Sequence, residues 1–214
     1  LSNQKQILSY ATPSHQKMSQ FTVKETKQAL TDSKLTVRVA LIEEKTKVID
    51  KIRAFWDEPV EWAKTPEVNE EIFHEEDYAD SCWGSSEFCD KTKEVSKYPL
   101  IALNGDEIVG FCHIVHDQRK DADCEWIILD FATFNPFRRY GFGSKFVTDI
   151  IAFCKKNSVN TVCKIEASSH IDNKPAIAFW NKNGFATIAT DVSFAKRDWA
   201  GLYNLNVYSG QNRY

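Results

Sequence analysis

Two arginines, a tyrosine and two glycines stand together at residues 138–143, RRYGFG, directly after a long apolar stretch. A helix expected to begin near Gly143 would present unpaired backbone N–H groups and the positive end of its dipole there. Glycines at 141 and 143 would let the backbone approach a bulky anion, and Arg138 and Arg139 could add charge-assisted hydrogen bonds. The stretch indicates a diphosphate site. The alternative is a plain strand-to-helix turn whose glycines serve packing.

Other known site patterns do not fit the sequence. RRYGFG lacks the Lys-Ser/Thr pair of a P-loop and is not a GxGxxG motif. The six cysteines form no CxxC pair, and the spacing of His74, Cys82 and Cys89 matches no zinc site. We therefore expect no metal.

The elements that must position this stretch are those of a mixed α/β sheet. The nearly apolar run CEWIILDFATF (124–134) is typical of a central strand covered on both faces. Asn104-Gly105 between two β-type runs predicts a hairpin with a type I′ turn. Further strands are expected at 35–42, 159–167, 185–190 and 201–209, and helices at 43–56, 144–156 and 173–185.

Composition indicates one globular domain. The chain has 214 residues, of which 43% are hydrophobic, and we expect a polar extension at 1–34 followed by a single domain at 35–214. The net charge of -3, without a basic stripe, argues against nucleic acid as a partner. With no membrane-length apolar run and no apolar leader, we expect a cytoplasmic protein with no membrane partner. Its cysteines would be reduced.

Two motifs together resemble a known family. R-x-x-G-x-G after a central strand is one, and the segment NKPAIAFWNKNGF (173–185), similar to N-x-x-A-x-x-x-Y-x-x-x-G-F, is the other. They resemble the GNAT superfamily of N-acetyltransferases over about residues 35–190. The resemblance implies a central mixed sheet of six to seven strands flanked by helices, and acetyl-CoA as acyl donor. It also implies that the central strand and the next one splay apart.

The resemblance implies which residues would hold the coenzyme. Its pantetheine arm would lie along Phe131, Ala132 and Thr133, and Asn173 would bond it. Trp180 stands where the family usually has a tyrosine, and it could pack against the coenzyme. The pyrophosphate would bind to backbone N–H groups of Arg139, Tyr140, Gly141, Phe142, Gly143 and Ser144, with Arg138 adding charge.

Acetyl transfer to an amine needs a base, for which two carboxylates are candidates. Glu125 starts the central strand, and Asp130 is a lone charge inside WIILDFATF. A buried carboxylate is costly unless paired, so it often marks function.

Trp180 leaves the general acid undefined, because an indole N–H cannot act as an acid at useful pH. Tyr140, Tyr203 or Tyr208 could take the role, or the thiolate could leave without help.

The acceptor site is expected in the segment before the hairpin. Ten acidic residues and one lysine lie between Asp57 and Asp80, and we predict acceptor contacts from Trp56, Trp62, Glu75 and Tyr78. Such a wall suits a small cationic amine, either a polyamine or an aminoglycoside-like molecule. A protein N-terminus or lysine is the second candidate. The alternatives are a solvated acidic helix face and a non-catalytic CoA-binding module. By analogy, the strand at 201–209 could form a homodimer.

Overall fold

In the computed structural model, the described residues are 35–58, 75–83, 94–119, 122, 124–160, 162–192 and 203–211. Within them, seven strands form one sheet in the order β1-β2-β3-β4-β5-β7-β6. The strands are β1 (Leu35–Val39), β2 (Val95–Asn104), β3 (Glu107–Asp117), β4 (Trp126–Thr133), β5 (Val162–His170), β6 (Ala186–Val192) and β7 (Tyr203–Gln211). The helices are η1 (Ile42–Glu44), α2 (Lys45–Trp56), α4 (Glu75–Trp83), α5 (Phe142–Asn157) and α6 (Lys174–Lys182). The predicted mixed α/β fold is confirmed.

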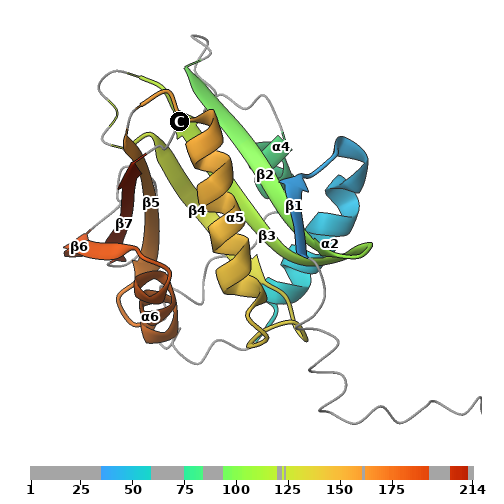
Figure 1. Ribbon diagram of the computed structural model, residues 1–214. Coiled ribbons are helices and arrows are strands. Elements are labelled where there is room, and N and C mark those ends of the chain that lie inside the picture. The colour runs from blue at the N-terminus through green and yellow to red at the C-terminus, as the bar shows by residue number, and fades with distance from the viewer. Residues whose placement is uncertain are drawn as a thin grey trace, which may run out of the picture.

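Helices cover both faces of this sheet (Figure 1). On one face, α5 packs Phe146, Val147 and Ile150 into a core that also receives residues of α6. On the other face, α2 packs Val48, Ile49 and Ile52 into a second core that α4 shares. β3 lies between two helical layers and is buried along nearly its whole length, whereas β4 alternates buried and half-buried residues because its second half has no partner in β5.

The hairpin forms as predicted, but its turn differs by one residue. Asn104 is the last residue of β2 and pairs with Glu107. The loop therefore consists of Gly105 and Asp106, and of these only Gly105 has a positive φ, at 60°. A glycine at the first central position is the requirement of a type II′ turn, not of the predicted type I′ turn.

The last strands also differ from the prediction. β5 begins three residues later than expected, because Val159 belongs to the connection after α5 and donates its backbone N–H to Glu125. β7 lies between β5 and β6 and pairs antiparallel with both. The predicted extension at 1–34 lies outside the described residues.

β4 and β5 separate halfway along their length, as the family resemblance implies. They are the one parallel pair of the described sheet, and their register covers only residues 126–128 against 165–167. Beyond Ile128, β4 continues to Thr133 without a partner in β5. A bulge marks the point of separation. His113 pairs with Asp130 and Ile114 with Ile128, so Leu129 is an extra residue in β4. A bulge bends its strand and increases the local twist. We call the unpaired region of β4 and β5 the splay.

Candidate functional site

The turn between β4 and α5 has an unusual backbone. Gly141 is the N-cap of α5 with a φ of 86°, and Arg139 has a φ of 68°. An added Cβ at Gly141 would meet nothing within 4 Å, so this glycine serves backbone conformation and not close packing. A positive φ at a residue such as Arg139 is uncommon, and such strain concentrates at functional sites.

The N-terminus of α5 has no side-chain cap among the described contacts. Its first helical hydrogen bond runs from the Lys145 N–H to the Gly141 carbonyl, at 3.1 Å. The N–H groups of Phe142, Gly143 and Ser144 therefore have no acceptor within the helix. With the helix dipole, they form a site suited to an anion such as a pyrophosphate.

Gly143 brings this helix end against β4 and α6. A Cβ there would lie 3.1 Å from Thr133 Oγ1 and 3.2 Å from the Phe179 ring. Nearby, the ring of Phe131 lies 5.3 Å from the rings of both Phe146 and Phe179. The residues predicted to hold the pantetheine arm and those predicted to hold the pyrophosphate thus lie together at the open end of the splay.

Arg138 differs from its prediction. Its Nε donates to the Thr133 carbonyl at 2.7 Å, and its Nη1 donates to Glu58 Oε2 at 2.5 Å. The guanidinium also lies 5.2 Å from the ring centre of Phe55 in α2. These contacts anchor the turn to the end of α2, so a phosphate contact from Arg138 is not favoured. The exposed Arg139 remains the candidate for that charge.

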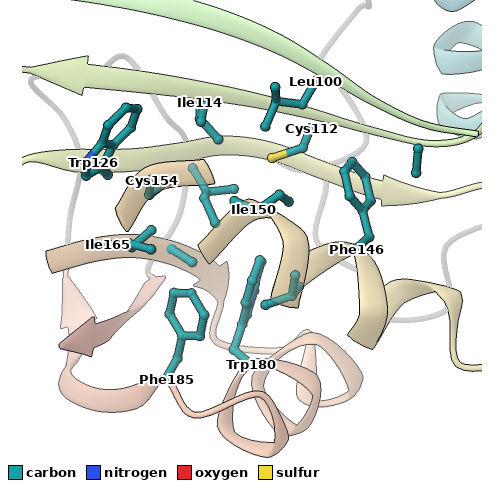
Figure 2. Packing of buried hydrophobic residues seen from close by; sticks show 14 of the residues in the cluster. Leu100, Cys112, Ile114, Trp126, Phe146, Ile150, Cys154, Ile165, Trp180 and Phe185 are labelled. Carbon is teal, nitrogen blue, oxygen red and sulfur yellow. The ribbon is translucent and has the colours of Figure 1, made fainter. Parts of the chain in front are cut away.

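Two residues of the second motif have structural partners. The Asn173 side chain accepts from the Ala176 N–H at 3.1 Å and caps α6. Trp180 is only 4% exposed and points into the core with Phe185, 4.9 Å between ring centres (Figure 2). This is a core position, reached from the splay through the Phe131 ring at 5.3 Å. Coenzyme contacts of Asn173 and Trp180 stay predictions.

Glu125 lies at the paired end of β4, away from the splay, and its carboxylate is fully engaged. Oε1 accepts from the Val159 N–H at 2.9 Å and lies 3.2 Å from His116 Nε2, while the Ser158 hydroxyl donates to Oε2. Burial opposes ionisation, but hydrogen bonds from Ser158, Asn160, Val159 and His116 together hold the Glu125 pKa below its usual value. This geometry favours a structural role, not that of the base.

Asp130 lies where a base could act. It directly follows the bulge residue Leu129, at the start of the splay, and its side chain keeps 33% of its exposure. His113 Nδ1 lies 3.7 Å from its Oδ2. Tyr78 approaches from α4: burial, the Asp130 charge and a hydrogen bond to Asp130 raise the pKa of the Tyr78 phenol well above its usual value. Between the two predicted bases, the structure favours Asp130.

The other predicted acceptor and acid residues are scattered. Trp56 is the last residue of α2 and is 41% exposed, Trp62 lies outside the described residues, and the Glu75 side chain is not described. Tyr140 is half-buried against the α5 core. Tyr208 is opposite Ile165, where β4 and β5 are still paired. The backbone of Tyr203 pairs with His170 at the splayed end.

Sequence reasoning missed buried polar residues in β3 and β5, the two strands on either side of β4. His113 is 1% exposed, and Ser168 Oγ and Ser169 Oγ are buried without a hydrogen-bond partner. His170 is also buried and accepts from the Asp172 N–H. The only signal in the sequence was that polar residues interrupt β-type runs. This signal does not reveal which of these residues lie close together in the folded sheet.

The described residues offer neither a metal site nor a membrane-spanning helix. They contain no group of three or more His, Cys, Asp or Glu side chains able to hold a metal ion. No helix among them is long and apolar enough to cross a membrane.

Known proteins resemble this chain in sequence and fold. Over 106 residues it is 30% identical to N-alpha-acetyltransferase 50 of Danio rerio, covering 49% of this chain and 60% of that protein. A GNAT-family acetyltransferase of Streptococcus pneumoniae has a TM-score of 0.56 at 15% identity, covering 82% of this chain and 99% of that one. NAA60 of Arabidopsis thaliana, in complex with acetyl-CoA, gives 0.54 at 11% identity with the same coverage.

The family model supports the same assignment. A third solved structure, the PaiA N-acetyltransferase of Thermoplasma acidophilum with coenzyme A, has a TM-score of 0.54 at 14% identity, covering 83% of this chain and 99% of that one. The sequence model of the Acetyltransferase (GNAT) family matches residues 55–185, more than half of the chain. This match spans the hairpin, the splayed strands, the turn at 138–143 and α6, so the chain belongs to the GNAT acetyltransferase family.

Proposed function

We propose that this protein is an N-acetyltransferase that moves the acetyl group of acetyl-CoA to a primary amine. The observation that carries the proposal is the splay, which begins after Ile128 and ends beside the uncapped N-terminus of α5. A pyrophosphate fits the helix N-terminus, and an extended pantetheine arm fits a strand edge that has no partner. The coenzymes in the Arabidopsis and Thermoplasma structures support this choice of donor.

Bound acetyl-CoA supplies a thioester, and the residues of the splay would manage protons and charge. The acceptor ammonium loses a proton to Asp130, directly or through one water. The neutral amine attacks the carbonyl carbon, the C–N bond forms, and the C–S bond breaks with its electron pair leaving on sulfur. Unpaired backbone N–H groups of β4 stabilise the oxyanion. The second amine proton passes to the thiolate or to solvent, so the core position of Trp180 does not prevent turnover.

The acceptor that we favour is the α-amine of a protein N-terminus. The support is the 30% identity to N-alpha-acetyltransferase 50, of which this chain spans 60%. A small cationic amine is the second candidate, favoured by the ten acidic residues between Asp57 and Asp80. We also propose a reducing compartment such as the cytoplasm, because the five described cysteines are free and buried.

Coenzyme binding is tested first, by calorimetric titration of acetyl-CoA. Gly141→Glu places a side chain and a negative charge in the turn and should abolish binding. Gly105→Glu is the matched control, because Gly105 also has a positive φ and open space around its Cβ position but lies in the β2–β3 turn. If both variants bind as the parent does, the turn at 138–143 is not the pyrophosphate site. If the parent binds neither acetyl-CoA nor CoA, the enzyme assignment fails.

Turnover is tested by thiol release with N-terminal peptides and polyamines as acceptors. Asp130→Asn should lose roughly 100- to 10,000-fold in kcat/KM, the usual contribution of a general base. Glu125→Gln should keep kcat within a few-fold and lower the unfolding temperature. The reverse pattern would make Glu125 the base. Tight acetyl-CoA binding without turnover on any amine would identify a non-catalytic CoA-binding module.

A further inference from the structure

A group of unassigned polar residues lies on the α2 and α4 face of the sheet, beside the splay. We propose that His113 of β3 and Tyr78 of α4 position the Asp130 carboxylate as the base of the reaction. This inference rests on the proposed function, because it requires an amine that loses its proton to Asp130. It extends that function by giving Asp130 two dedicated partners from two other elements.

His113 is placed by the strand register. It is directly opposite Asp130 in the β3–β4 ladder, so both side chains point to the same face. The distance of 3.7 Å between Nδ1 and Oδ2 is longer than a hydrogen bond. Catalytic hydrogen bonds are often long in free enzymes and shorten when substrate binds. A small movement of Asp130 would therefore complete this contact.

The burial of His113 is not explained by other contacts. Its side chain is 1% exposed, and its Nε2 is buried with no hydrogen-bond partner among the described residues. Leaving a buried polar atom unpaired is costly, so an unpaired histidine in a strand needs a reason. With Nε2 isolated, the one described polar neighbour of the ring is the Asp130 carboxylate. The described polar contact of the His113 ring is thus the one with Asp130, which fits a role in positioning that carboxylate.

Tyr78 approaches the same carboxylate from α4. Its ring centre lies 6.4 Å from that of Phe111 of β3, and burial, together with the two groups Asp130 and Cys82, raises the pKa of its phenol. Because burial and the negative charge of Asp130 keep the phenol protonated, Tyr78 retains an O–H that can donate to the carboxylate. Donors from β3 and α4 would fix the rotamer of Asp130 before substrate arrives.

Other ionisable groups also lie near Asp130. Cys82 of α4 faces the same cluster, but burial raises the pKa of its thiol to about 12, so it stays neutral. Lys97 of β2 lies near enough to influence Cys82 electrostatically. Cys112 of β3 is completely buried. Burial, and to a smaller extent the Asp130 charge, raise the pKa of its thiol, so it stays neutral. From β5, the register places Glu166 and His170 on the face of Ile127, which is the α2 and α4 face that Asp130 shares.

The test compares pH profiles of kcat/KM for four variants of the full chain. His113→Leu removes the ring, His113→Asn keeps an amide donor near the position of Nδ1, and Tyr78→Phe removes only the hydroxyl. His116→Leu is the matched control, because His116 is equally buried in β3 and lies 3.2 Å from a different carboxylate, Glu125. Acetyl-CoA affinity and thermal unfolding are measured for each variant, so that lost folding is not mistaken for lost positioning.

We expect His113→Leu to lower kcat by about tenfold or more, a part of the general-base contribution. The acidic limb of its kcat/KM pH profile should move to higher pH, because a carboxylate that has lost a hydrogen-bond donor is easier to protonate. Acetyl-CoA affinity should change less than twofold. His113→Asn should recover most of the rate, and Tyr78→Phe should move the limb in the same direction as His113→Leu. His116→Leu should lower the unfolding temperature and leave the limb in place.

Two results would overturn the inference. One is that His113→Leu and His116→Leu change kcat and the pH profile alike, which would make both residues merely structural. The other is that His113→Asn and Tyr78→Phe both keep the parental rate and profile, which decides the matter even if His113→Leu does not fold. Failure of the proposed function looks different, since the parent would then bind acetyl-CoA without acetylating any amine.

Discussion

Gly141 and Gly143 are two residues apart in the same turn and meet different physical needs. Gly141 has a φ of 86° and open space around its Cβ position, whereas Gly143 has Thr133 Oγ1 within 3.1 Å of that position. The first glycine is needed for the path of the backbone, and the second for the approach of α5 to β4. Both needs arise where the coenzyme is expected, so either residue could be mistaken for a direct ligand.

Alanine at each position should separate these two needs. Gly141→Ala should cost about 1 kcal/mol of stability through backbone strain alone. Gly143→Ala should push Thr133 away and weaken acetyl-CoA binding as well. Adding Thr133→Ala removes one of the two close contacts, the other being the Phe179 ring, so it should partly restore binding to Gly143→Ala and leave Gly141→Ala unchanged. Urea unfolding and calorimetry measure both quantities. Rescue of Gly141→Ala by Thr133→Ala would contradict this assignment.

Glu44 offers a pH-dependent contribution to stability outside the site. The Arg38 guanidinium donates two hydrogen bonds to it, at 2.6 and 2.7 Å, and lowers the Glu44 pKa from 4.5 to about 2. A lowered carboxyl pKa stabilises the fold above the unfolded-state pKa, and this stabilisation is lost as the pH falls toward 2.

Glu44→Gln should therefore be less stable at pH 7 by about 0.5–1 kcal/mol, a value kept small because the Arg38 partner is partly exposed. The difference from the parent should shrink steadily below about pH 4.5. Urea unfolding at several pH values measures it. A constant difference between pH 7 and pH 3 would show that the carboxylate charge is not responsible.

Among the elements, the end of α2 and the turn after β4 are joined through one side chain. Arg138 bonds to the Thr133 carbonyl and to Glu58, which is 80 residues earlier in the chain, and its guanidinium lies over Phe55. These contacts fix the turn after β4 relative to α2, the helix that leads into the segment in which the acceptor site is expected. The role of Arg138 is thus to hold two elements together.

A double-mutant cycle of Arg138→Met and Glu58→Gln should give a coupling energy of about 1 kcal/mol in unfolding experiments. Methionine keeps much of the apolar contact with Phe55 and removes the charge. Acetyl-CoA affinity should fall less than tenfold in Arg138→Met and more in Arg139→Met, if Arg139 is the arginine that meets the phosphates. Equal losses of affinity would show that Arg138 also contacts the coenzyme.

Sequence patterns predicted the elements better than their contacts. The apolar run at 124–134 identified β4, and the spacing of Phe146, Val147 and Ile150 identified α5, because burial on one or two faces leaves a periodic record. The turn predicted to bind the coenzyme could be picked out because its glycines and arginines are adjacent in sequence. The bulge at Leu129 and the meeting of Asp130 with His113 and Tyr78 depend on register and on three separate elements. No local pattern encodes them.

At the scale of the whole molecule, the sheet consists of two parts joined by a short ladder. β1 to β4 form one part and β5, β7 and β6 the other, and the β4–β5 register spans three residue pairs. The core on the α5 face includes Trp126 and Ile128 of β4 and Ile165 and Ala167 of β5, and so supports this connection from one side. The site is open because the two parts diverge, so its width depends on how that core is packed.

The prediction that residues 35–214 form one domain can be tested by removing residues 1–34. Leu35 is buried in the core at the start of β1, so the shortened chain should keep the parental unfolding transition. Acetyl-CoA affinity should stay within about threefold of the parent, a difference of less than 1 kcal/mol. Circular dichroism and calorimetry measure both. A loss of cooperative unfolding would show that the first residues are part of the domain.

The position of β7 has a consequence for how the chain is made. β7 lies between β5 and β6, although the ribosome synthesises it after both of them. Until residues 203–211 emerge, β6 has no neighbour in this sheet and β5 has only its three pairs with β4. A nascent or prematurely terminated chain would therefore expose two strand edges that invite pairing with other chains. Messages truncated before β7 should yield aggregates that quality-control proteases remove, and not a weakened enzyme.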